Sequence, residues 1–514
     1  MDTIETINVN GAAYYLPANE DDVIFLINKA KSEGKIICMR GSAHSFPLIK
    51  TLEAENATDK NLYVMLSKMN VADIDEKAMT VTVAAGCHLG VDPFDPTKIS
   101  TLENSLLYQL DQKGLAIPDL GGITHQTVGG FLSTGSSGGS TQFSFEDSLI
   151  SISFINCSST GAQKVTFNRP VPDNPDDPFY GAGVATIGLF GVIVSATFKC
   201  VAKFNIKGTE TTTLDNLTDC PIDLFGNGSN GKPSLQTFLE QTQYTRLMWW
   251  PQKGITKMVV WQASQIAPTP DFKVIPYQEV PWIDGSPIPA TMAADLLFSA
   301  IGTWPNWLMD SMGNTTEYKV IKELIDVSFY PAILPLICKI FVPLGEDNHF
   351  QDVWYNGIPM DNQMSDRLMP VWFTELWIPI DQAQSVMSDL QNFYNESTKN
   401  TGAFSCEIYA SRSNSFWMSP SYNTNVIRID VFWFANNSGN PVDFYQPFWE
   451  RLQKYNFRPH WGKYLPDGNS VQGVSYLQSL YPKWNDWMNL RNEMDPGQVF
   501  VSDYWRSHLD IPAV

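Results

Sequence analysis

A histidine at position 44 lies in a loop of small residues that runs from Met39 to Phe46 with the sequence MRGSAHSF. Residues 36–38 before it form a short apolar run that predicts a buried strand. Loops rich in glycine and serine leave backbone N–H groups free to point in one direction, and such clusters of donors bind phosphate oxygens. A neutral imidazole beside an anion site is a nucleophile. Taken alone, however, this loop fits a surface turn with an incidental histidine better.

Two later stretches have the same composition. Residues 117–140 are dense in glycine, serine and threonine, and residues 181–192 form a third small-residue run. Glycine at this density does not pack a core and suits a backbone pressed against a flat, polyphosphorylated ligand. A flexible linker is the alternative, but Val128, Phe131 and Leu132 predict that the second stretch is anchored.

Short strands and helices must position these loops. Apolar and alternating patterns predict strands over residues 6–15, 35–39, 61–66, 79–86, 148–155 and 188–199. Helical spacing is found over residues 21–32 and 102–113, the second ending at Gly114. This order of elements predicts an α+β fold whose first 110 or so residues are built from parallel-type units.

The middle of the chain has longer alternating strands that are rich in tryptophan. Strands are predicted over residues 246–251 and 257–263, joined as a hairpin around Lys253-Gly254, and over residues 370–379 and 425–434. Residues 382–399 have helical spacing. Residues 266–312, first rich in proline and then apolar, are expected to form an irregular insertion over a ligand pocket.

The composition of the whole chain limits the possible functions. Of 514 residues, 43% are apolar and 17% are charged, which is typical of a packed globular protein. The formal net charge of -20 argues against binding nucleic acid or an anionic membrane, because both need a positive surface. The seven cysteines are scattered without zinc-binding spacing and are expected to be buried free thiols. The sequence shows no apolar run of membrane-spanning length and no signal peptide, so a cytoplasmic protein is expected.

The three loops have no counterpart in the common nucleotide-binding motifs. The chain has neither a Walker A loop nor a strand–Gly-x-Gly-x-x-Gly–helix unit, which argues against a P-loop nucleotidase and a Rossmann enzyme. Residues 40–46, 124–139 and 188–191 together resemble the FAD-binding domain of the vanillyl-alcohol oxidase family of flavoproteins. Residues 416–420 (FWMSP) and 457–463 (FRPHWGK) narrow the resemblance to the aldonolactone and alditol oxidase branch, which is also related to sterol oxidases with covalent flavin.

The resemblance implies three parts. Residues 1–204 are expected to form a PCMH-type FAD-binding domain of two α+β subdomains, and residues 205–450 a cap (substrate) domain with a large antiparallel sheet. Residues 451–514 are expected to complete the flavin site. The residues expected to bind FAD are Met39, Arg40, Gly41, Ser42, Ala43, His44, Ser45, Phe46, Gly122, Thr124, His125, Val128, Gly129, Gly130, Ser133, Thr134, Gly135, Ser137, Gly138, Gly188, Gly191, Val192 and Lys463.

His44 matches the position at which this branch attaches the 8α-methyl carbon of the flavin to a histidine. Imidazole is neutral near pH 7, its nitrogen is a good nucleophile, and such a bond raises the redox potential of the flavin. His125 is the rival, but it matches a loop histidine of the branch that is not the attachment point. Relatives with two links use a cysteine in the second loop, where this chain has none, so a single link through His44 is expected. Non-covalent FAD with a hydrogen-bonding His44 is the alternative.

Hydride transfer from an alcohol carbon to flavin N5 needs an oriented hydroxyl, a proton acceptor and positive charge near the flavin. The resemblance implies that Lys463 supplies the charge, with His460 of the same motif among the catalytic residues. It also implies that Glu375 orients the hydroxyl or accepts its proton. Phe373 and Trp377 share the strand face of Glu375, so we expect Glu375 to be buried with a raised pKa. An outward-facing Glu375 is the alternative.

This chain departs from the family pattern at two positions. Alditol and sterol oxidases carry an arginine two residues after this glutamate, where this chain has Trp377, and Asp430 stands where alditol oxidases have a histidine. A flat apolar wall thus replaces a donor that polarises the hydroxyl. Arg428, on the Asp430 face of its strand, compensates in one interpretation and forms a solvent-facing salt bridge in another. The expected catalytic residues are Glu375, Lys463, Trp377, His460 and Arg428.

The electron acceptor is indicated by Gly129, which matches the family position beside flavin C4a where a larger side chain blocks oxygen. Glycine leaves room and favours an oxidase, although a glycine kept for backbone packing is the competing explanation. We therefore expect FAD-dependent oxidation of a C–OH group in a sugar, polyol, lactone or more apolar alcohol, with O2 reduced to H2O2. A dehydrogenase of the same fold with a quinone or cytochrome acceptor, and a non-catalytic flavin- or carbohydrate-binding protein, are the alternatives. No metal is expected, and the oligomeric state is not predicted.

Overall fold

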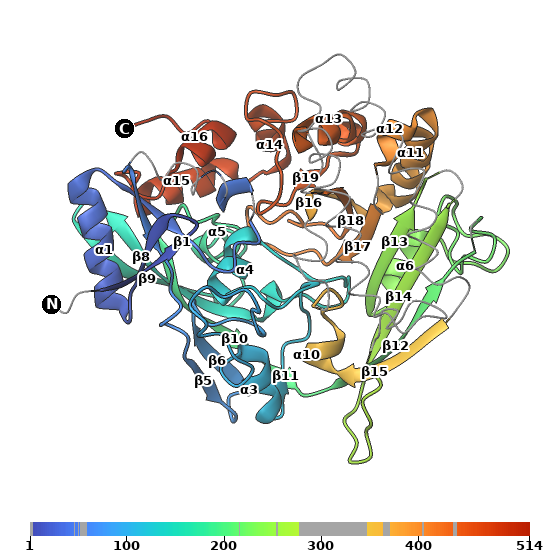
Figure 1. The fold of residues 1–514 in the computed structure, drawn as a ribbon, viewed down its shortest axis with the longest axis horizontal. Coiled ribbons are helices and arrows are strands. Elements are labelled where there is room, and N and C mark those ends of the chain that lie inside the picture. Colours follow the sequence, from blue (N-terminus) through green and yellow to red (C-terminus); the bar gives the residue numbers. More distant parts are fainter. Residues whose placement is uncertain are drawn as a thin grey trace, which may run out of the picture.

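The computed structural model describes residues 4–45, 47–49, 51, 59–214, 216–252, 255–276, 347–362, 371–402, 406–434 and 439–514. Figure 1 shows two smaller sheets beside each other in the N-terminal part and one large sheet in the middle of the chain. The C-terminal helices return to the N-terminal part. The fold therefore brings the C-terminal segment back to the N-terminal part, which contains the three small-residue loops.

The first sheet has the strand order β1-β2-β4-β3, with β1 (Glu5–Val9), β2 (Ala12–Leu16), β3 (Ile36–Met39) and β4 (Asn61–Val64). The single strand predicted over residues 6–15 is wrong. Asn10 and Gly11 take positive φ angles of 52° and 89° and reverse the chain, so the segment is an antiparallel hairpin. The predicted first helix is confirmed as α1 (Glu20–Glu33), which Asn19 caps and Gly34 ends in a left-handed conformation.

The second sheet has the order β5-β6-β10-β8-β9 and consists of β5 (Ala72–Asp75), β6 (Thr80–Ala84), β8 (Leu149–Ser158), β9 (Gly161–Asn168) and β10 (Val192–Lys199). All its pairs are antiparallel, so the predicted parallel-type units occur only as the pairs β2–β4 and β3–β4. The physical reason is the short turns after β5 and β8, because a parallel pair needs a crossover of a dozen or so residues. A small antiparallel pair, β7 (Leu115–Ala116) with β11 (Val201–Ala202), lies beside them.

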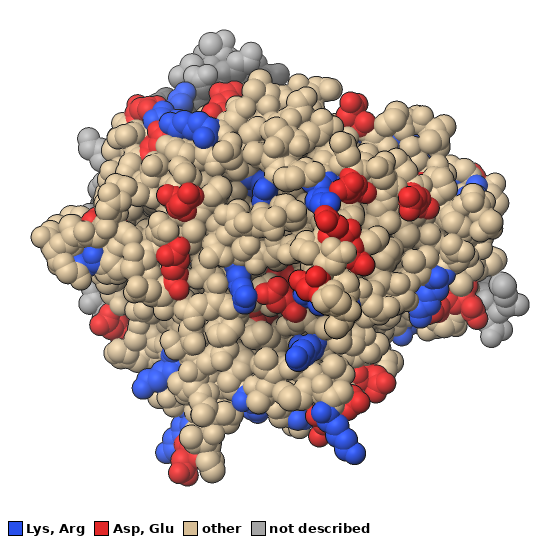
Figure 2. Space-filling model, turned by 180° about the vertical axis from the view of Figure 1, so that it is seen from behind, with Lys and Arg blue, Asp and Glu red and all other residues tan. Residues whose placement is uncertain are grey.

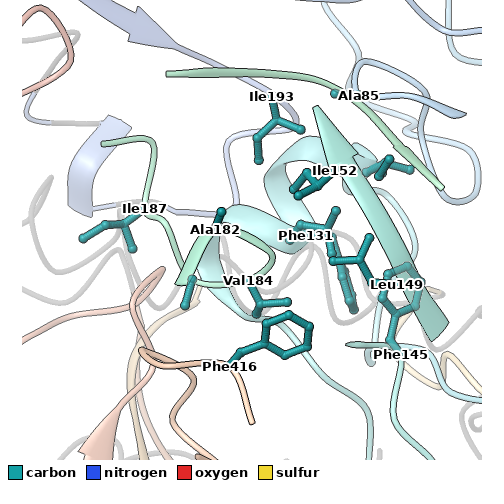
Figure 3. Close-up of a cluster of buried hydrophobic side chains, with 14 of the residues drawn as sticks. Ala85, Phe131, Phe145, Leu149, Ile152, Ala182, Val184, Ile187, Ile193 and Phe416 are labelled. Atoms are coloured by element: carbon teal, nitrogen blue, oxygen red, sulfur yellow. The ribbon is translucent and has the colours of Figure 1, made fainter. Parts of the chain in front are cut away.

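The second small-residue stretch contains a helix that the sequence did not predict, α4 (Val128–Thr134). Thr127 caps it by accepting a hydrogen bond from the backbone N–H of Gly130, and Gly135 ends it with a φ of 69°. Figure 3 shows Phe131 of α4 pointing into the core beside Phe145. Val128, Phe131 and Leu132 are all buried, so the predicted anchoring is confirmed and the linker interpretation is wrong. The helix α3 (Leu106–Gln112) is shorter than predicted.

The large sheet has eight strands in the order β15-β12-β14-β13-β17-β18-β16-β19, and all its pairs are antiparallel. Its strands are β12 (Asn205–Thr212), β13 (Tyr244–Trp250), β14 (Lys257–Ile266), β15 (Asp347–Val353), β16 (Val371–Pro379), β17 (Cys406–Ser411), β18 (Val426–Phe434) and β19 (Arg458–Pro459). The four strands predicted for this part are confirmed as β13, β14, β16 and β18. The hairpin residues Lys253-Gly254, and residues 277–312 of the predicted insertion, lie outside the described residues.

Helices cover one side of the large sheet. The predicted helix over residues 382–399 is α11 (Ala383–Glu396) followed by α12 (Thr398–Thr401), and α13 (Pro441–Leu452) and α6 (Leu235–Gln241) pack with it against apolar strand residues such as Leu376 and Ile429. The opposite side carries polar and aromatic side chains and contacts the second small-residue stretch. We call this side the inner face. The remaining helices are α5 (Pro178–Ala182), α10 (Trp354–Gly357), α14 (Val474–Leu480), α15 (Trp484–Met494) and α16 (Asp503–Leu509), with short 3-10 turns at Glu146–Ser148, Ile380–Gln382 and Gln453–Tyr455.

The distribution of charge on the surface and the state of the cysteines agree with what the composition predicts. On the face shown in Figure 2, basic side chains are spread among acidic ones rather than gathered in one patch. Six of the cysteines are free and buried, as predicted, and Cys338 lies outside the described residues. Within the described ranges, no helix has the length and apolar character needed to cross a bilayer.

Candidate functional site

A cavity opens where the three loops meet the C-terminal segment. Of the residues predicted to bind the cofactor, its wall includes Met39, Arg40, Gly41, Ser42, Ala43, His44, Ser45, Gly129, Gly130, Ser133, Thr134, Gly188, Gly191 and Lys463. We call residues 40–45, 129–134 and 188–191 the backbone cradle. Three segments far apart in sequence thus surround one space.

Free backbone donors mark the first loop. In the described part of the chain, the N–H groups of Gly41, Ser42, Ala43 and Ser45 have no hydrogen-bond acceptor, although all four residues line the cavity. The side chain of Ser42 donates to the carbonyl of His125 at 2.6 Å and ties the first loop to the second. Unpaired N–H groups at a cavity wall are suited to phosphate oxygens.

Glycine is required where the loops touch each other. A Cβ on Gly41 would lie 2.6 Å from Thr127 Oγ1, so a side chain there would push the two loops apart. Gly188 has a φ of 77°, and a Cβ there would meet no atom within 4 Å. A backbone wall with such open space beside it fits a dinucleotide such as FAD.

The structure does not place every predicted cofactor residue at this wall. Gly122, Thr124, His125, Val128, Gly135, Ser137, Gly138 and Val192 do not line the cavity, and Phe46 lies outside the described residues. Val128 and Val192 point into the core, and the N–H of Gly138 donates to the buried Asp119 at 3.0 Å. Density of small residues does not reveal which way each residue faces.

Other wall residues were missed. They include His88, Gln126, Thr127, Ser136, Trp461, Phe500, Ser502 and Trp505. Trp461 lies within the FRPHWGK motif, whereas residues 500–505 carry no motif and reach the cavity only because the C-terminal segment folds back. Gly462 packs against the cradle, since a Cβ there would lie 3.1 Å from Ser45 Oγ and 3.2 Å from Thr134 Cγ2.

His44 lies in the cavity as a half-buried imidazole. Its ring centre is 5.8 Å from that of His125. Burial lowers the pKa of His44 to about 3, and the charge of Lys463 acts in the same direction. The imidazole is therefore neutral at physiological pH.

Glu375 stands on the inner face and is 2% exposed, which confirms its predicted burial and contradicts the outward-facing alternative. Its Oε1 accepts two hydrogen bonds, from Trp377 Nε1 at 2.7 Å and from Arg428 Nε at 2.7 Å, and forms an ion pair with Arg428 Nη2 at 2.6 Å. Within the described ranges, its Oε2 has no hydrogen-bond donor. One oxygen is therefore held by the protein and the other remains available.

The predicted rise in the pKa of Glu375 is wrong. Burial does raise the pKa of this carboxyl, but the positive charge of Arg428, together with that of Lys463, more than offsets burial and the net pKa is lowered. Glu375 is thus a carboxylate held by a guanidinium. It is a good hydrogen-bond acceptor and a weaker base than predicted.

Arg428 is 7% exposed, so its solvent-facing interpretation is wrong. Besides Glu375, its Nη1 donates to the backbone carbonyls of Ser137 at 2.9 Å and Gly138 at 3.0 Å. The guanidinium lies between the rings of Trp377 and Tyr409, with its central carbon 4.6 Å and 4.7 Å from their centres. Arg428 thus returns a guanidinium to Glu375 from the neighbouring strand and ties the inner face to the second small-residue stretch.

His460 and Lys463 connect the inner face to the cavity, which both of them line. The N–H of His460 donates to the carbonyl of Glu375 at 3.0 Å, and its Nδ1 accepts from the N–H of Gly462 at 3.0 Å. Burial lowers the pKa of His460 to about 4, so the ring is neutral and carries its proton on Nε2. Lys463 Nζ lies 4.1 Å from the centre of the Phe373 ring, also on the inner face. Glu375, Trp377 and Arg428 do not themselves line the cavity.

Gly129 lines the cavity, but its surroundings favour the packing explanation. A Cβ there would lie 3.1 Å from Ala85 Cβ and 3.2 Å from the Ala85 carbonyl oxygen. The N–H of Gly129 also donates to that carbonyl at 2.9 Å. Close contact with Ala85 is thus enough to require glycine here.

Comparison with known proteins identifies the family of the chain. A family model described as D-arabinono-1,4-lactone oxidase matches residues 196–508, and one described as FAD binding domain matches residues 11–91. The chain is similar to L-gulonolactone oxidase of Scyliorhinus torazame, with 20% identity over 96% of this chain and 93% of that protein. It is also similar to L-gulono-1,4-lactone dehydrogenase of Mycobacterium tuberculosis, with 20% identity over 97% of this chain and 96% of that protein.

A solved structure shares the fold. Cholesterol oxidase from Brevibacterium sterolicum superposes with a TM-score of 0.67 at 15% identity, covering 97% of this chain and 94% of that one. This confirms the predicted fold class, a PCMH-type FAD-binding fold with a large antiparallel sheet. Because the first family model spans more than half of the chain, the protein belongs to the D-arabinono-1,4-lactone oxidase family, and its N-terminal part is an FAD-binding domain.

Proposed function

We propose that the protein oxidises a secondary C–OH group of a neutral sugar lactone or related alcohol, using FAD bound in the backbone cradle and O2 as the final electron acceptor. Membership of a lactone oxidase family supports the reaction class. The observation that carries the proposal is the joining of the cradle to the inner face by the turn 460–463, because His460 and Lys463 line the cavity while His460 is bonded to Glu375.

Bound FAD supplies the hydride acceptor for this reaction. Lys463 holds positive charge at the cavity wall, where it stabilises negative charge that develops as the hydride is accepted. Glu375 accepts the hydrogen bond of the substrate hydroxyl with Oε2 and takes its proton, while Arg428 and Trp377 fix Oε1. His460 acts by position, because its Nδ1 is already occupied by the N–H of Gly462.

His44 is the residue we propose to carry the flavin covalently. It lies in the cavity, and its lowered pKa keeps the imidazole neutral and nucleophilic. His125 is not among the residues that line the cavity, which supports His44 over its rival.

The substrate wall is expected to be partly aromatic. Phe373 and Phe432 face each other across β16 and β18 with ring centres 5.1 Å apart, next to Lys463 and on the side of Glu375. Rings of this kind stack on the apolar faces of a sugar ring, while Glu375 binds a hydroxyl. A neutral ring with an adjacent C–OH group fits both features.

A dehydrogenase is the second candidate. It is favoured by the relative that is named a dehydrogenase and by the packing of Gly129 against Ala85, which removes the argument for oxygen access at that position. The test of both is a panel of lactones, sugars, polyols, sterols and aryl alcohols, assayed for O2 uptake and H2O2 release and, separately, with an artificial electron acceptor. Substrate-dependent H2O2 release supports the oxidase, and reduction of the artificial acceptor without O2 uptake supports the dehydrogenase.

A further inference from the structure

Three carboxyl groups stand side by side on the inner face. In the register of the sheet, Asp430 of β18 lies directly opposite Glu375 of β16 on one side and Glu407 of β17 on the other. Directly opposed residues on neighbouring strands have Cβ atoms about 5 Å apart. All three side chains are buried. Three anions in such a row repel each other strongly unless cations neutralise them.

The available guanidinium groups go to the two outer members of the row. Arg246 pairs with Glu407 and, at 2.6 Å, with Asp361, while Arg428 pairs with Glu375. Asp430 is 2% exposed and has no salt bridge within the described ranges. Its Oδ1 is fully buried without a hydrogen-bond partner in the same part of the chain. A buried carboxylate without a cation is costly, whereas a buried carboxylic acid is not.

We propose that Asp430 is a neutral carboxylic acid in the working protein and a positioning residue, whose O–H is a hydrogen-bond donor beside the available oxygen of Glu375. This inference rests on the proposed function for its catalytic consequence, although the protonation state is independent of it. Arg428 cannot donate this hydrogen bond beside Glu375 Oε2, because its N–H groups are directed to Glu375 Oε1 and to the carbonyls of Ser137 and Gly138. Trp377 donates to Glu375 Oε1 and leaves Oε2 without a donor.

The electrostatic surroundings agree with a neutral Asp430. Burial raises the pKa of Asp430 well above its ordinary value, and the charges of Glu375 and Glu407 raise it further. Arg428 and Lys463 act in the opposite direction without cancelling these effects. The titratable or charged groups that interact with Asp430 from the surrounding elements are Glu375, Glu407, Arg428, Lys463, Cys406 and Tyr409.

The proton of Asp430 is not consumed in the proposed reaction. In the proposed oxidation the substrate alcohol loses a hydride, which bound FAD would accept, and a hydroxyl proton, which Glu375 takes, while Asp430 keeps its own proton. Its O–H orients Glu375 Oε2 and the substrate oxygen, a donor function that Trp377 does not supply.

The first test measures stability, which does not depend on catalysis. The free energy of unfolding of the purified flavoprotein is measured in denaturant between pH 5 and pH 8 for the wild type, Asp430→Asn and Glu407→Gln. An acid whose pKa is raised on folding makes the folded state bind a proton that the unfolded state releases above pH ~4, so wild-type stability falls as pH rises through this window. Asparagine does not ionise, so the Asp430→Asn variant lacks this fall in stability with rising pH. We expect Asp430→Asn to gain stability relative to the wild type as pH rises, whereas Glu407→Gln, which breaks an ion pair, loses stability.

A parallel loss of stability in Asp430→Asn and Glu407→Gln, or a difference between Asp430→Asn and wild type that does not change with pH, would overturn the proposal.

Kinetics supply the second test. We expect Asp430→Leu to lower kcat/KM by a factor of about 10² and Asp430→Asn, which keeps a donor, to recover about tenfold of this loss. Wild-type kcat/KM should decline at alkaline pH as Asp430 ionises, and Asp430→Asn should lack this decline. An Asp430→Asn variant as impaired as Asp430→Leu, with the alkaline decline retained, contradicts the inference. Absence of any oxidised alcohol would instead contradict the proposed function and leave the stability test decisive for Asp430.

Discussion

The backbone cradle lines the cavity, the turn 460–463 connects the inner face to it, and these two regions are built in opposite ways. The cradle presents main chain: four N–H groups of its first loop have no acceptor within the described ranges, and glycine is needed where loops touch. The inner face presents ionised and aromatic side chains from four strands, most of them held by one another. A binding site made of main-chain groups keeps its hydrogen-bond donors when side chains are substituted. A site made of side chains changes its charges and hydrogen bonds with each substitution.

This difference explains how the chain tolerates a substitution on the inner face. Trp377 replaces the arginine expected from the family, and Arg428 returns the guanidinium from the adjacent strand, because the register places these two residues opposite each other. Charge near Glu375 is thereby retained while its origin changes. The cradle has no comparable freedom, since its N–H groups depend on the path of the backbone.

The largest expected effect concerns the cradle. His44→Ala should abolish covalent attachment of the flavin, so that acid denaturation releases all of it from the chain. The measurement is flavin absorbance in the precipitated protein compared with the supernatant. His125→Ala is the matched control and should keep the flavin attached. Covalent flavin in His44→Ala would assign the link to another residue.

Arg428→Met tests the inner face. It removes one partner of a buried ion pair and leaves Glu375 uncompensated, which should lower the free energy of unfolding by about 3–5 kcal/mol. Chemical denaturation gives this value. Arg412, whose side chain is 45% exposed, is the control, and Arg412→Met should cost less than about 1 kcal/mol because its ion pair is solvated. Adding Glu375→Gln to Arg428→Met should recover part of the loss.

Lys463→Met tests the connection between the two regions. Loss of one preorganised charge should slow reduction of the bound flavin by a factor on the order of 10² or more. Stopped-flow absorbance under anaerobic conditions measures this rate. The control is Lys454, a surface lysine that forms an ion pair with Asp389. In the Lys454→Met variant, the bound flavin should be reduced at the wild-type rate. A rate close to wild type in Lys463→Met would remove Lys463 from the mechanism.

Trp377→Phe is expected to have the smallest effect. It keeps the flat wall beside Arg428 but deletes the hydrogen bond to Glu375 Oε1, which should cost about 1–2 kcal/mol of folding stability because the acceptor is charged. Denaturation measures the loss, and KM for the best substrate shows whether Glu375 has moved. A loss as large as that of Arg428→Met would mean that the tryptophan, and not the arginine, holds Glu375.

The sequence predicted some elements of this site correctly and missed others. The loop over residues 40–45, the strands that carry Glu375 and Arg428, and the burial of Glu375 are as predicted, because composition and alternation are local properties. The helix α4 was missed because its residues, VGGFLST, are poor helix formers that depend on a Thr127 cap and on packing of Phe131. The pKa of Glu375 was predicted in the wrong direction because its partner comes from 53 residues away.

The sequence by itself determined which segments are bare backbone and which strands have two unlike faces, since both depend on residue type and on a spacing of two. Tertiary structure decided which charged side chains of those strands lie next to each other and interact. Strand register pairs Arg428 with Trp377 and sets Asp430 between two carboxylates, and the fold-back of the C-terminal segment brings Lys463 to the cavity. Electrostatic energy depends on distance through space, and distance along the chain contains little of that information.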